Sequence, residues 1–195
     1  TGAVHRHLEV PGEKELSGRG VSYCAVCDGP FFKNRNIVVV GGGDSACSEA
    51  IYLTSISDKV SIIHRRDSFR AQKAVVDKML AAGVKPIYNS VVESINGSVK
   101  VDSVSIKNVQ TGEVSDFPCD AVFIFTGMVP QTALVEMLPK DEFGYIKTNE
   151  NMETAMPGLF AAGDVRSKSF RQIVTAVSDG AIAANSAKHY IENLG

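Results

Sequence analysis

The sequence lacks a long apolar run, an apolar N-terminal segment and an excess of basic residues. No apolar stretch approaches the roughly 20 residues that a membrane-spanning helix needs. The segment from Thr1 to Arg6 lacks the apolar core of a secretory signal peptide. The net charge is −2, from 20 basic and 22 acidic side chains. A protein that binds nucleic acid usually has a basic face, which makes its net charge positive. We therefore expect a cytoplasmic chain that binds neither membranes nor nucleic acids.

Cysteine is scarce, with four residues in a chain of 195. In a long chain without a secretory signal, the C-x-x-C pair formed by Cys24 and Cys27 is expected to be redox-active or metal-binding. A zinc site would need two further ligands, but Cys47 and Cys119 do not form a second close pair. The spacing therefore favours a redox pair over half a zinc site, and we expect no metal.

A carboxylate, Asp28, directly follows the cysteine pair. One interpretation is that it only terminates a turn or a short helix. Next to a dithiol, it could instead shuttle a proton to the thiolate that leaves when a disulfide is opened. Asp28 is therefore a candidate catalytic residue.

A glycine-rich loop, Gly41-x-Gly43-x-x-Ala46, joins an apolar strand expected over 37–40 to a helix expected over 43–54. Gly41 permits a tight turn, Gly43 allows a pyrophosphate to approach closely, and Ala46 lets the helix pack closely on the strand. Free N–H groups and the helix dipole favour anions at such a helix N-terminus. The context favours a nucleotide site over a purely structural turn.

Arginines stand where many dinucleotide sites carry an acid. The second strand, expected over 60–64, ends at His64-Arg65-Arg66, and Arg70 follows one helical turn later. An acid there would repel a 2′-phosphate, whereas guanidinium groups pair with phosphate oxygens in a bidentate way. A solvated basic turn is the alternative. The position favours a 2′-phosphate site, and hence NADPH over NADH.

The predicted elements alternate between strand and helix and then become a meander. A helix is expected over 71–82 and a strand over 84–88, alternating residues over 91–118 predict an antiparallel insertion, and a buried strand covers 121–125. This order predicts a three-layer, Rossmann-like α/β fold. Beyond it we expect a short helix, β structure near 145–146, a strand over 159–161 and a helix over about 172–191. The predicted divisions are a linker over 1–7, a nucleotide domain with the dithiol over 8–130, and a last part over 131–195.

The last part holds the motif Ala161-Ala162-Gly163-Asp164. It could be only a strand, a turn and a capped helix. At the carboxyl end of a strand, however, it has the position at which open α/β sheets bind ligands. Asp164 could then accept hydrogen bonds from sugar-like hydroxyl groups.

Taken together and in order, these motifs closely resemble bacterial low-molecular-weight thioredoxin reductases. The resemblance covers nearly the whole chain and rests on Cys24-x-x-Cys27-Asp28-Gly29, the loop Gly-Gly-Gly-Asp-Ser-Ala, His64-Arg65-Arg66-Asp67-x-Phe69-Arg70-Ala71, and Ala161-Ala162-Gly163-Asp164 with Arg171-Gln172.

The resemblance implies that electrons pass from NADPH through FAD to the dithiol and on to thioredoxin. Cys27 matches the flavin-facing cysteine, Cys24 the cysteine that attacks thioredoxin, and Asp28 the acid–base residue. The full-length enzyme is expected to be a homodimer. The implied cofactor-binding residues are Gly41, Gly43, Asp44, Ser45, Ala46, His64, Arg65, Arg66, Arg70 and Gly127 for NADPH, and Gly163, Asp164, Arg171, Gln172 and Ile173 for FAD.

The family also carries an FAD-binding half with its own G-x-G-x-x-G, and this chain has no second such fingerprint. We therefore expect a fragment without that half, inactive alone and uncertain to bind FAD. Two alternatives stay open. One is the flavoprotein partner of a peroxidase, expected to lack the arginine pair and to prefer NADH, and the other is a non-catalytic NADPH-binding module.

Overall fold

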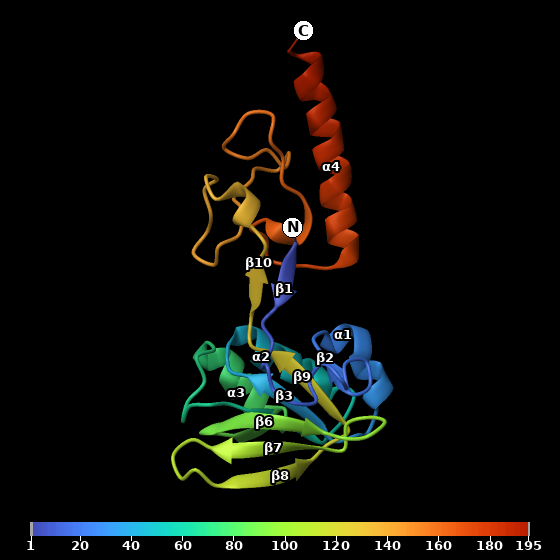
Figure 1. Ribbon diagram of the computed structural model, residues 1–195, viewed down its shortest axis with the longest axis vertical. Coiled ribbons are helices and arrows are strands. Elements are labelled where there is room, and N and C mark those ends of the chain that lie inside the picture. Colours follow the sequence, from blue (N-terminus) through green and yellow to red (C-terminus); the bar gives the residue numbers. More distant parts are fainter. Residues whose placement is uncertain (1, 195) are drawn as a thin grey trace. The chain divides into compact units, whose positions relative to one another are not determined.

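The computed structural model describes residues 2–194, which fold into two compact units. The first unit, Arg6–Gly127, carries the dithiol and the glycine loop, and we call it the sheet unit. The second consists of residues 2–5 and 128–194, and we call it the terminal unit. Figure 1 labels the helices and strands of both units.

The sheet unit is built on a five-stranded parallel sheet in the order β2-β9-β3-β4-β5. Both faces of a parallel sheet are usually covered, so its strands are apolar throughout rather than alternating. Ile37 to Val40 and Ala121 to Ile124 are accordingly buried at every position. The strands are β2 (Val21–Ser22), β9 (Ala121–Phe125), β3 (Ile37–Gly41), β4 (Val60–Ile63) and β5 (Lys85–Ile87).

Two helices cover one face of this sheet. α2 (Asp44–Thr54) and α3 (Lys73–Ala81) belong to the core that Ile37, Val39 and Phe123 form on that face. α2 buries its small residues there, which lets the helix lie close to β3. The helix layer therefore places the N-terminus of α2 directly after the glycine loop.

An antiparallel meander of three strands covers the other face, as Figure 1 shows in green below the sheet. Its strands are β6 (Ser90–Asn96), β7 (Ser103–Asn108) and β8 (Val114–Pro118). Val104 and Ile106 of β7 and Val92 and Ile95 of β6, between which the strand register shifts, point into a second core with residues of β3, β4 and β9. The predicted three-layer, Rossmann-like fold with a β insertion is confirmed.

The terminal unit combines a two-stranded ribbon, short turns and one long helix. β1 (Ala3–His5), within a segment expected to be a linker, pairs with β10 (Met128–Pro130). The 3₁₀ turns η2 (Ala133–Val135) and η3 (Gly163–Val165) precede α4 (Ile173–Glu192), which agrees with the helix predicted there.

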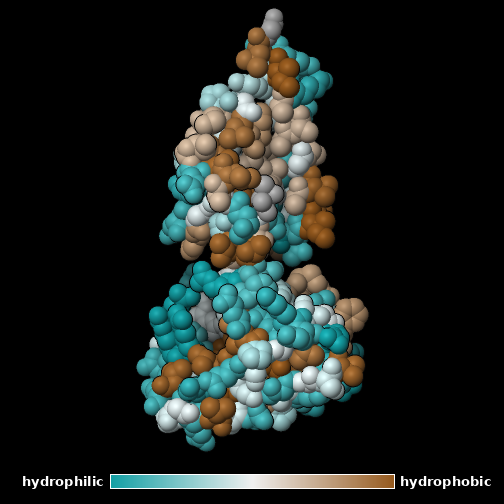
Figure 2. All heavy atoms as spheres, in the orientation of Figure 1, coloured by the Kyte–Doolittle hydropathy of each residue, from teal (hydrophilic) through white to brown (hydrophobic). Residues whose placement is uncertain are grey.

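Large apolar side chains of α4 remain exposed, among them Ile173, Val174, Val177 and Ile191. Figure 2 shows brown surface at both ends of this helix. None of these four residues belongs to the small core of this unit, which Leu138, Ile146, Ala161 and Val165 form. None of the helices that the structure describes combines the length and apolarity needed to cross a membrane.

One local prediction was wrong. Residues 159–161 do not form a strand, because only an isolated bridge between Glu153 and Phe160 is made there. α1 (Ala25–Asp28) is followed directly by the 3₁₀ turn η1 (Gly29–Phe32), whose second residue is Pro30. Proline is tolerated in the first turn of a helix, where its missing N–H has no partner to lose.

Candidate functional site

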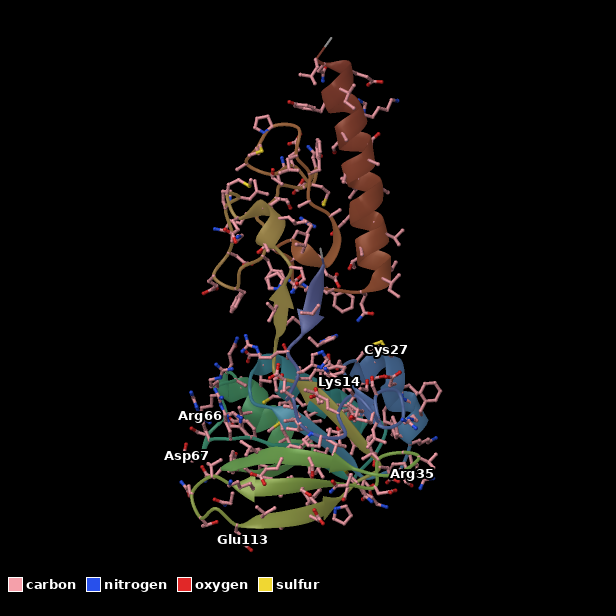
Figure 3. All side chains as sticks on the ribbon, in the orientation of Figure 1. Lys14, Cys27, Arg35, Arg66, Asp67 and Glu113 are labelled. Atoms are coloured by element: carbon pink, nitrogen blue, oxygen red, sulfur yellow. A yellow bond between two sulfur atoms is a disulfide. The ribbon has the colours of Figure 1, made fainter. Side chains whose placement is uncertain are left out.

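Cys24 and Cys27 are joined as a disulfide at the carboxyl edge of the parallel sheet. β2 ends at Ser22, and α1 begins immediately after Cys24, which is its N-cap. The Sγ atom of Cys24 accepts a hydrogen bond from the backbone N–H of Cys27 at 3.2 Å. Cys27, labelled in Figure 3, is exposed, while Cys24 is half-buried. Cys27 is therefore the more exposed residue of the pair, and Cys24 lies at the N-terminus of α1.

The backbone around the disulfide is held by Ser22, a residue that the sequence motifs did not single out. Ser22 is buried, and its Oγ accepts a hydrogen bond from the Cys24 N–H at 3.1 Å. The Asp28 N–H donates to the Cys24 carbonyl at 3.1 Å, which closes the turn of α1. The Asp28 side chain forms no hydrogen bond or ion pair with the rest of residues 2–194. Its carboxylate therefore has no partner among the described residues, and its role as a proton donor stays a prediction.

A buried carboxylate, Glu13, anchors the residue before Cys24. The Tyr23 hydroxyl donates to Glu13 Oε1 at 2.6 Å, and the N–H groups of Leu8 and Glu9 donate to the same carboxylate at 3.0 and 2.7 Å. His7 Nδ1 lies 3.2 Å from Glu13 Oε1. Burial acts to raise the pKa of Glu13, but the hydrogen bonds from these groups prevail and lower it.

Replacing Glu13 with alanine should destabilise the sheet unit by about 3 kcal/mol, because several partly buried donors lose a charged acceptor. The pKa of Glu13 is lower in the fold than its ordinary value of 4.5. The stabilisation is therefore full above that value and is lost as the pH falls through the lower folded value. Urea unfolding from pH 7 to pH 3 measures both effects. Glu113→Ala, at an exposed carboxyl in the same unit, is the control, and equal stability of the two variants at pH 7 would contradict this role.

The three glycines of the glycine loop differ in how much space each leaves for a side chain. A Cβ at Gly41 would lie 2.6 Å from both Ala46 Cβ and the Phe125 carbonyl oxygen. A Cβ at Gly42 would lie 2.1 Å from His64 Nδ1, whereas one at Gly43 would meet nothing within 4 Å. Gly41 and Gly42 are thus required by the fold, while Gly43 borders open space.

The N-terminus of α2 is left available to a ligand. Gly43 is its N-cap and supplies no side-chain cap, and Asp44 and Ser45 are exposed in the first turn. The Asp44 carboxylate accepts a hydrogen bond from the Gln72 N–H at 2.8 Å. Asp44, predicted to contact the cofactor, therefore ties the α2 N-terminus to the segment before α3.

Three exposed arginines, Arg65, Arg66 and Arg70, follow the carboxyl end of β4. Within residues 2–194 none of their guanidinium groups forms a hydrogen bond or an ion pair with a side chain. The Arg70 N–H donates to the Gly42 carbonyl at 2.8 Å. The parallel sheet thus brings these arginines to the same edge as the glycine loop and the dithiol.

His64, predicted as a cofactor ligand, is buried beneath the loop rather than exposed beside the arginines. Its ring stacks on Phe69 with centroids 5.2 Å apart. Burial lowers the pKa of His64, hydrogen bonds to the backbone of Gly41 and Ser68 oppose this, and the charge of Arg65 lowers it further. The ring therefore packs against the glycine loop at Gly42, and contact of His64 with a cofactor stays a prediction.

Gly127, another predicted cofactor contact, follows β9 with a φ of 118°, a conformation that favours glycine. A Cβ there would meet no atom within 4 Å. The space beside it is therefore open, as it is beside Gly43.

In the terminal unit, the predicted motif forms the turn η3, and Asp164 Oδ1 is buried without a hydrogen-bond partner. The nearest cation, Lys168 Nζ, lies 3.8 Å away. Arg171 lies over the Tyr145 ring, 3.8 Å from its centroid. Gln172 is the N-cap of α4 and forms a capping box with Thr175, while Ile173 is 85% exposed.

A buried carboxylate on α4, Asp179, holds this turn in place. It accepts hydrogen bonds from the Gly163 N–H and from Lys168 Nζ, both at 3.0 Å, and from Arg166 at 3.2 Å. Burial acts to raise the pKa of Asp179, but these donors and the two cationic charges lower it. The sequence motifs missed Asp179, because only the folded chain brings it to Gly163. In the described part of the chain, no cluster of three His, Cys, Asp or Glu residues could hold a metal ion.

Comparisons with known proteins place these features in one family. Residues 1–180 match the family described as "Pyridine nucleotide-disulphide oxidoreductase". The chain is 53% identical over 195 residues to a thioredoxin reductase of Treponema pallidum, covering 100% of this chain and 64% of that protein. It is 52% identical over 198 residues to a thioredoxin reductase of Bacillus subtilis, with 99% and 62% covered.

A solved structure of thioredoxin reductase from Streptococcus pyogenes matches with a TM-score of 0.92 and 53% identity, over 99% of this chain and 64% of that one. The resemblance predicted from the motifs is thus confirmed, and the chain spans less than two thirds of the length of these relatives. With its glycine loop and its disulfide, the chain belongs to the pyridine nucleotide-disulphide oxidoreductase family.

Proposed function

We propose that this chain carries the NADPH-binding domain and the redox dithiol of a thioredoxin-disulfide reductase, together with the C-terminal part of its FAD-binding domain. The carrying observation is that one edge of a parallel sheet holds a disulfide, a glycine loop and three arginines without carboxylate partners. This combination joins a site for a phosphorylated dinucleotide to a group that accepts two electrons.

The residues of the sheet unit fit NADPH. The free N–H groups at the start of α2 suit a pyrophosphate, and the space beside Gly43 lets it approach the backbone. Arg65, Arg66 and Arg70 suit a 2′-phosphate, because their guanidinium groups have no competing carboxylate. Open space at Gly127 allows a ligand near the end of β9.

The terminal unit fits part of an FAD site. The buried Asp164 Oδ1 lacks a donor, which a ribityl or ribose hydroxyl group would supply. Gly163, Arg171, Gln172 and Ile173 would line the same site, with Asp179 holding the Gly163 turn. NADPH supplies hydride and FAD relays its two electrons to the disulfide when both cofactors are bound.

Cys24, Cys27 and Asp28 have different roles in the reduction of thioredoxin. Two electrons and one proton convert the disulfide into one thiolate and one thiol. A Cys24 thiolate would keep the hydrogen bond from the Cys27 N–H and lie at the N-terminus of α1, and both effects favour its charge. It would attack the disulfide of thioredoxin, Cys27 would resolve the mixed disulfide, and Asp28 would give a proton to the departing thiolate.

Exposed apolar residues next to Cys27 suit a protein partner. Val26 is 58% exposed and Phe31 is 80% exposed, on either side of that cysteine in the chain. The exposed apolar residues of α4 support burial against further protein in the full-length enzyme. We place that enzyme in the cytoplasm as a homodimer, as the resemblance implies.

An assay with NADPH, FAD, thioredoxin and a thiol reporter tests this function. The full-length protein should reduce thioredoxin, and the 195-residue chain alone should not. A full-length protein that binds both cofactors but leaves thioredoxin oxidised would defeat the proposal. Equal or faster turnover with NADH would instead favour the flavoprotein partner of a peroxidase.

A further inference from the structure

Glu49, on α2, is a half-buried carboxyl to which the chemistry above gives no role. Its Oε2 atom is shielded from solvent and has no hydrogen-bond partner in residues 2–194. Burial raises the pKa of this carboxyl. A carboxyl that keeps its proton is a hydrogen-bond donor. Since nearly all buried polar atoms in native proteins have partners, Oε2 needs a partner that residues 2–194 do not supply in the disulfide form.

The disulfide segment runs alongside α2. A Cβ at Gly29 would lie 3.1 Å from Leu53 and 3.2 Å from Ile56, and the Asn34 N–H donates to the Ile56 carbonyl at 3.2 Å. The chain after Gly29 therefore follows α2 toward its C-terminal end. Ala25, between the two cysteines, is 1% exposed in the core that α2 shares. The four residues before Gly29 thus lie beside the preceding turn of α2.

Glu49 belongs to that preceding turn. It stands three residues before Tyr52 and four before Leu53, the two residues of α2 that a Cβ at Gly29 would approach, to 3.6 and 3.1 Å. Residues at these spacings share one face of a helix, and side chains tilt toward the helix N-terminus. Glu49 therefore faces the segment that carries the disulfide.

We propose that the Glu49 carboxyl donates a hydrogen bond to the Cys24–Cys27 dithiol once the disulfide is reduced. Two electrons and one proton break the S–S bond and leave one thiol and one thiolate, and the thiolate is the acceptor that Oε2 lacks in the disulfide form. The electrons come from the flavin in the proposed reaction or from dithiothreitol in the test. A hydrogen bond to a thiolate stabilises its charge, so Glu49 lowers the pKa of the reactive thiol.

Few other titratable groups face this place. From α1 there is Asp28, and from α2 there is Tyr52; the strands beneath α2 present apolar side chains. On α3, the residues in the shared core are apolar, while its charged residues Lys73, Asp77 and Lys78 are exposed. The inference rests on the proposed function only in treating the disulfide as redox-active.

Alkylation of the reduced chain tests the proposal. The chain is reduced with dithiothreitol and desalted, and its reaction with iodoacetamide is followed against pH, with the modified cysteine identified by mass spectrometry. At pH 7, Glu49→Met should slow alkylation of the dithiol about tenfold, because a hydrogen bond to a charged group is lost. Glu49→Gln should stay within about twofold, because its amide still donates.

Other residues of the same chain serve as controls. Burial raises the thiol pKa of Cys47 to about 11 and that of Cys119 to about 12, so neither should compete at pH 7. Asp58→Asn, at an exposed carboxyl beyond the other end of α2, should leave the rate unchanged. Melting temperatures show whether each variant folds, and Glu49→Leu replaces Glu49→Met if the methionine variant does not.

Unchanged alkylation in the apolar variants would overturn the proposal. Faster alkylation in both Glu49→Met and Glu49→Gln would also overturn it, because an ionised carboxylate would then be opposing the thiolate. Alkylation needs neither NADPH nor FAD, so its outcome is separate from that of thioredoxin reduction by the full-length protein. A failure here would leave the proposed function standing.

Discussion

The double variant Arg65→Ala/Arg66→Ala should bind NADPH at least 100-fold more weakly than the unchanged chain and bind NADH with unchanged affinity. The two dinucleotides differ only in the 2′-phosphate, so the ratio of their affinities isolates that contact. Each charge-assisted hydrogen bond contributes about 1.5–3 kcal/mol, and about 1.4 kcal/mol corresponds to a tenfold change. Both arginines are exposed and have no carboxylate partner, so their loss should not disturb the fold.

Calorimetric titration of the 195-residue chain with each dinucleotide measures the effect. Arg35→Ala is the matched control, since Arg35 is also an exposed arginine of the sheet unit but pairs with Asp120 at 3.8 Å. Figure 3 shows Arg35 and Arg66 on different sides of this unit. Equal losses for NADPH and NADH, or an equal loss in the control, would contradict a specific 2′-phosphate site.

The sheet and the glycine loop could be predicted because their signals are local. A buried parallel strand has an unbroken apolar run, and the spacing of Gly41, Gly43 and Ala46 follows from contacts within one strand–loop–helix unit. The cysteine pair and Asp28 likewise lie on one turn, which the spacing predicts. The structure adds that this turn lies at the carboxyl edge of the sheet. These parts of the site needed no knowledge of distant neighbours.

The missed residues depend on neighbours far along the chain. Gly42 is constrained by His64, Glu13 by Tyr23, and Asp179 by Gly163. β1 is a strand only because β10 lies beside it. Conversely, residues 159–161 look like a strand in sequence but find only a single bridge. Apolar residues alone do not form a strand without a neighbouring strand to share a ladder of hydrogen bonds.

Gly43→Ala should fold normally and lose NADPH. An added Cβ meets no atom within 4 Å, and the backbone at Gly43, with a φ of −97° and a ψ of 179°, is open to alanine. The methyl group would, however, occupy the space through which a pyrophosphate reaches the N–H groups of α2. We expect affinities for both NADPH and NADH to fall by at least about tenfold, since the obstruction concerns the shared pyrophosphate rather than the 2′-phosphate.

Gly42→Ala, in contrast to Gly43→Ala, should lower the stability of the fold. Its Cβ would lie 2.1 Å from His64 Nδ1, and the ring is buried against Phe69, so the loop must shift at a cost of about 1–3 kcal/mol in stability. Combining it with His64→Ala removes the collision, and the two substitutions should couple favourably in a double-mutant cycle. Urea unfolding measures the stability of each variant and dinucleotide titration measures its affinity, so the two experiments distinguish the effects of the Gly42 and Gly43 substitutions. The Gly42 substitution should then lower stability, and the Gly43 substitution should lower dinucleotide affinity. Normal NADPH binding by the Gly43→Ala chain would contradict the proposal that the pyrophosphate binds at this loop.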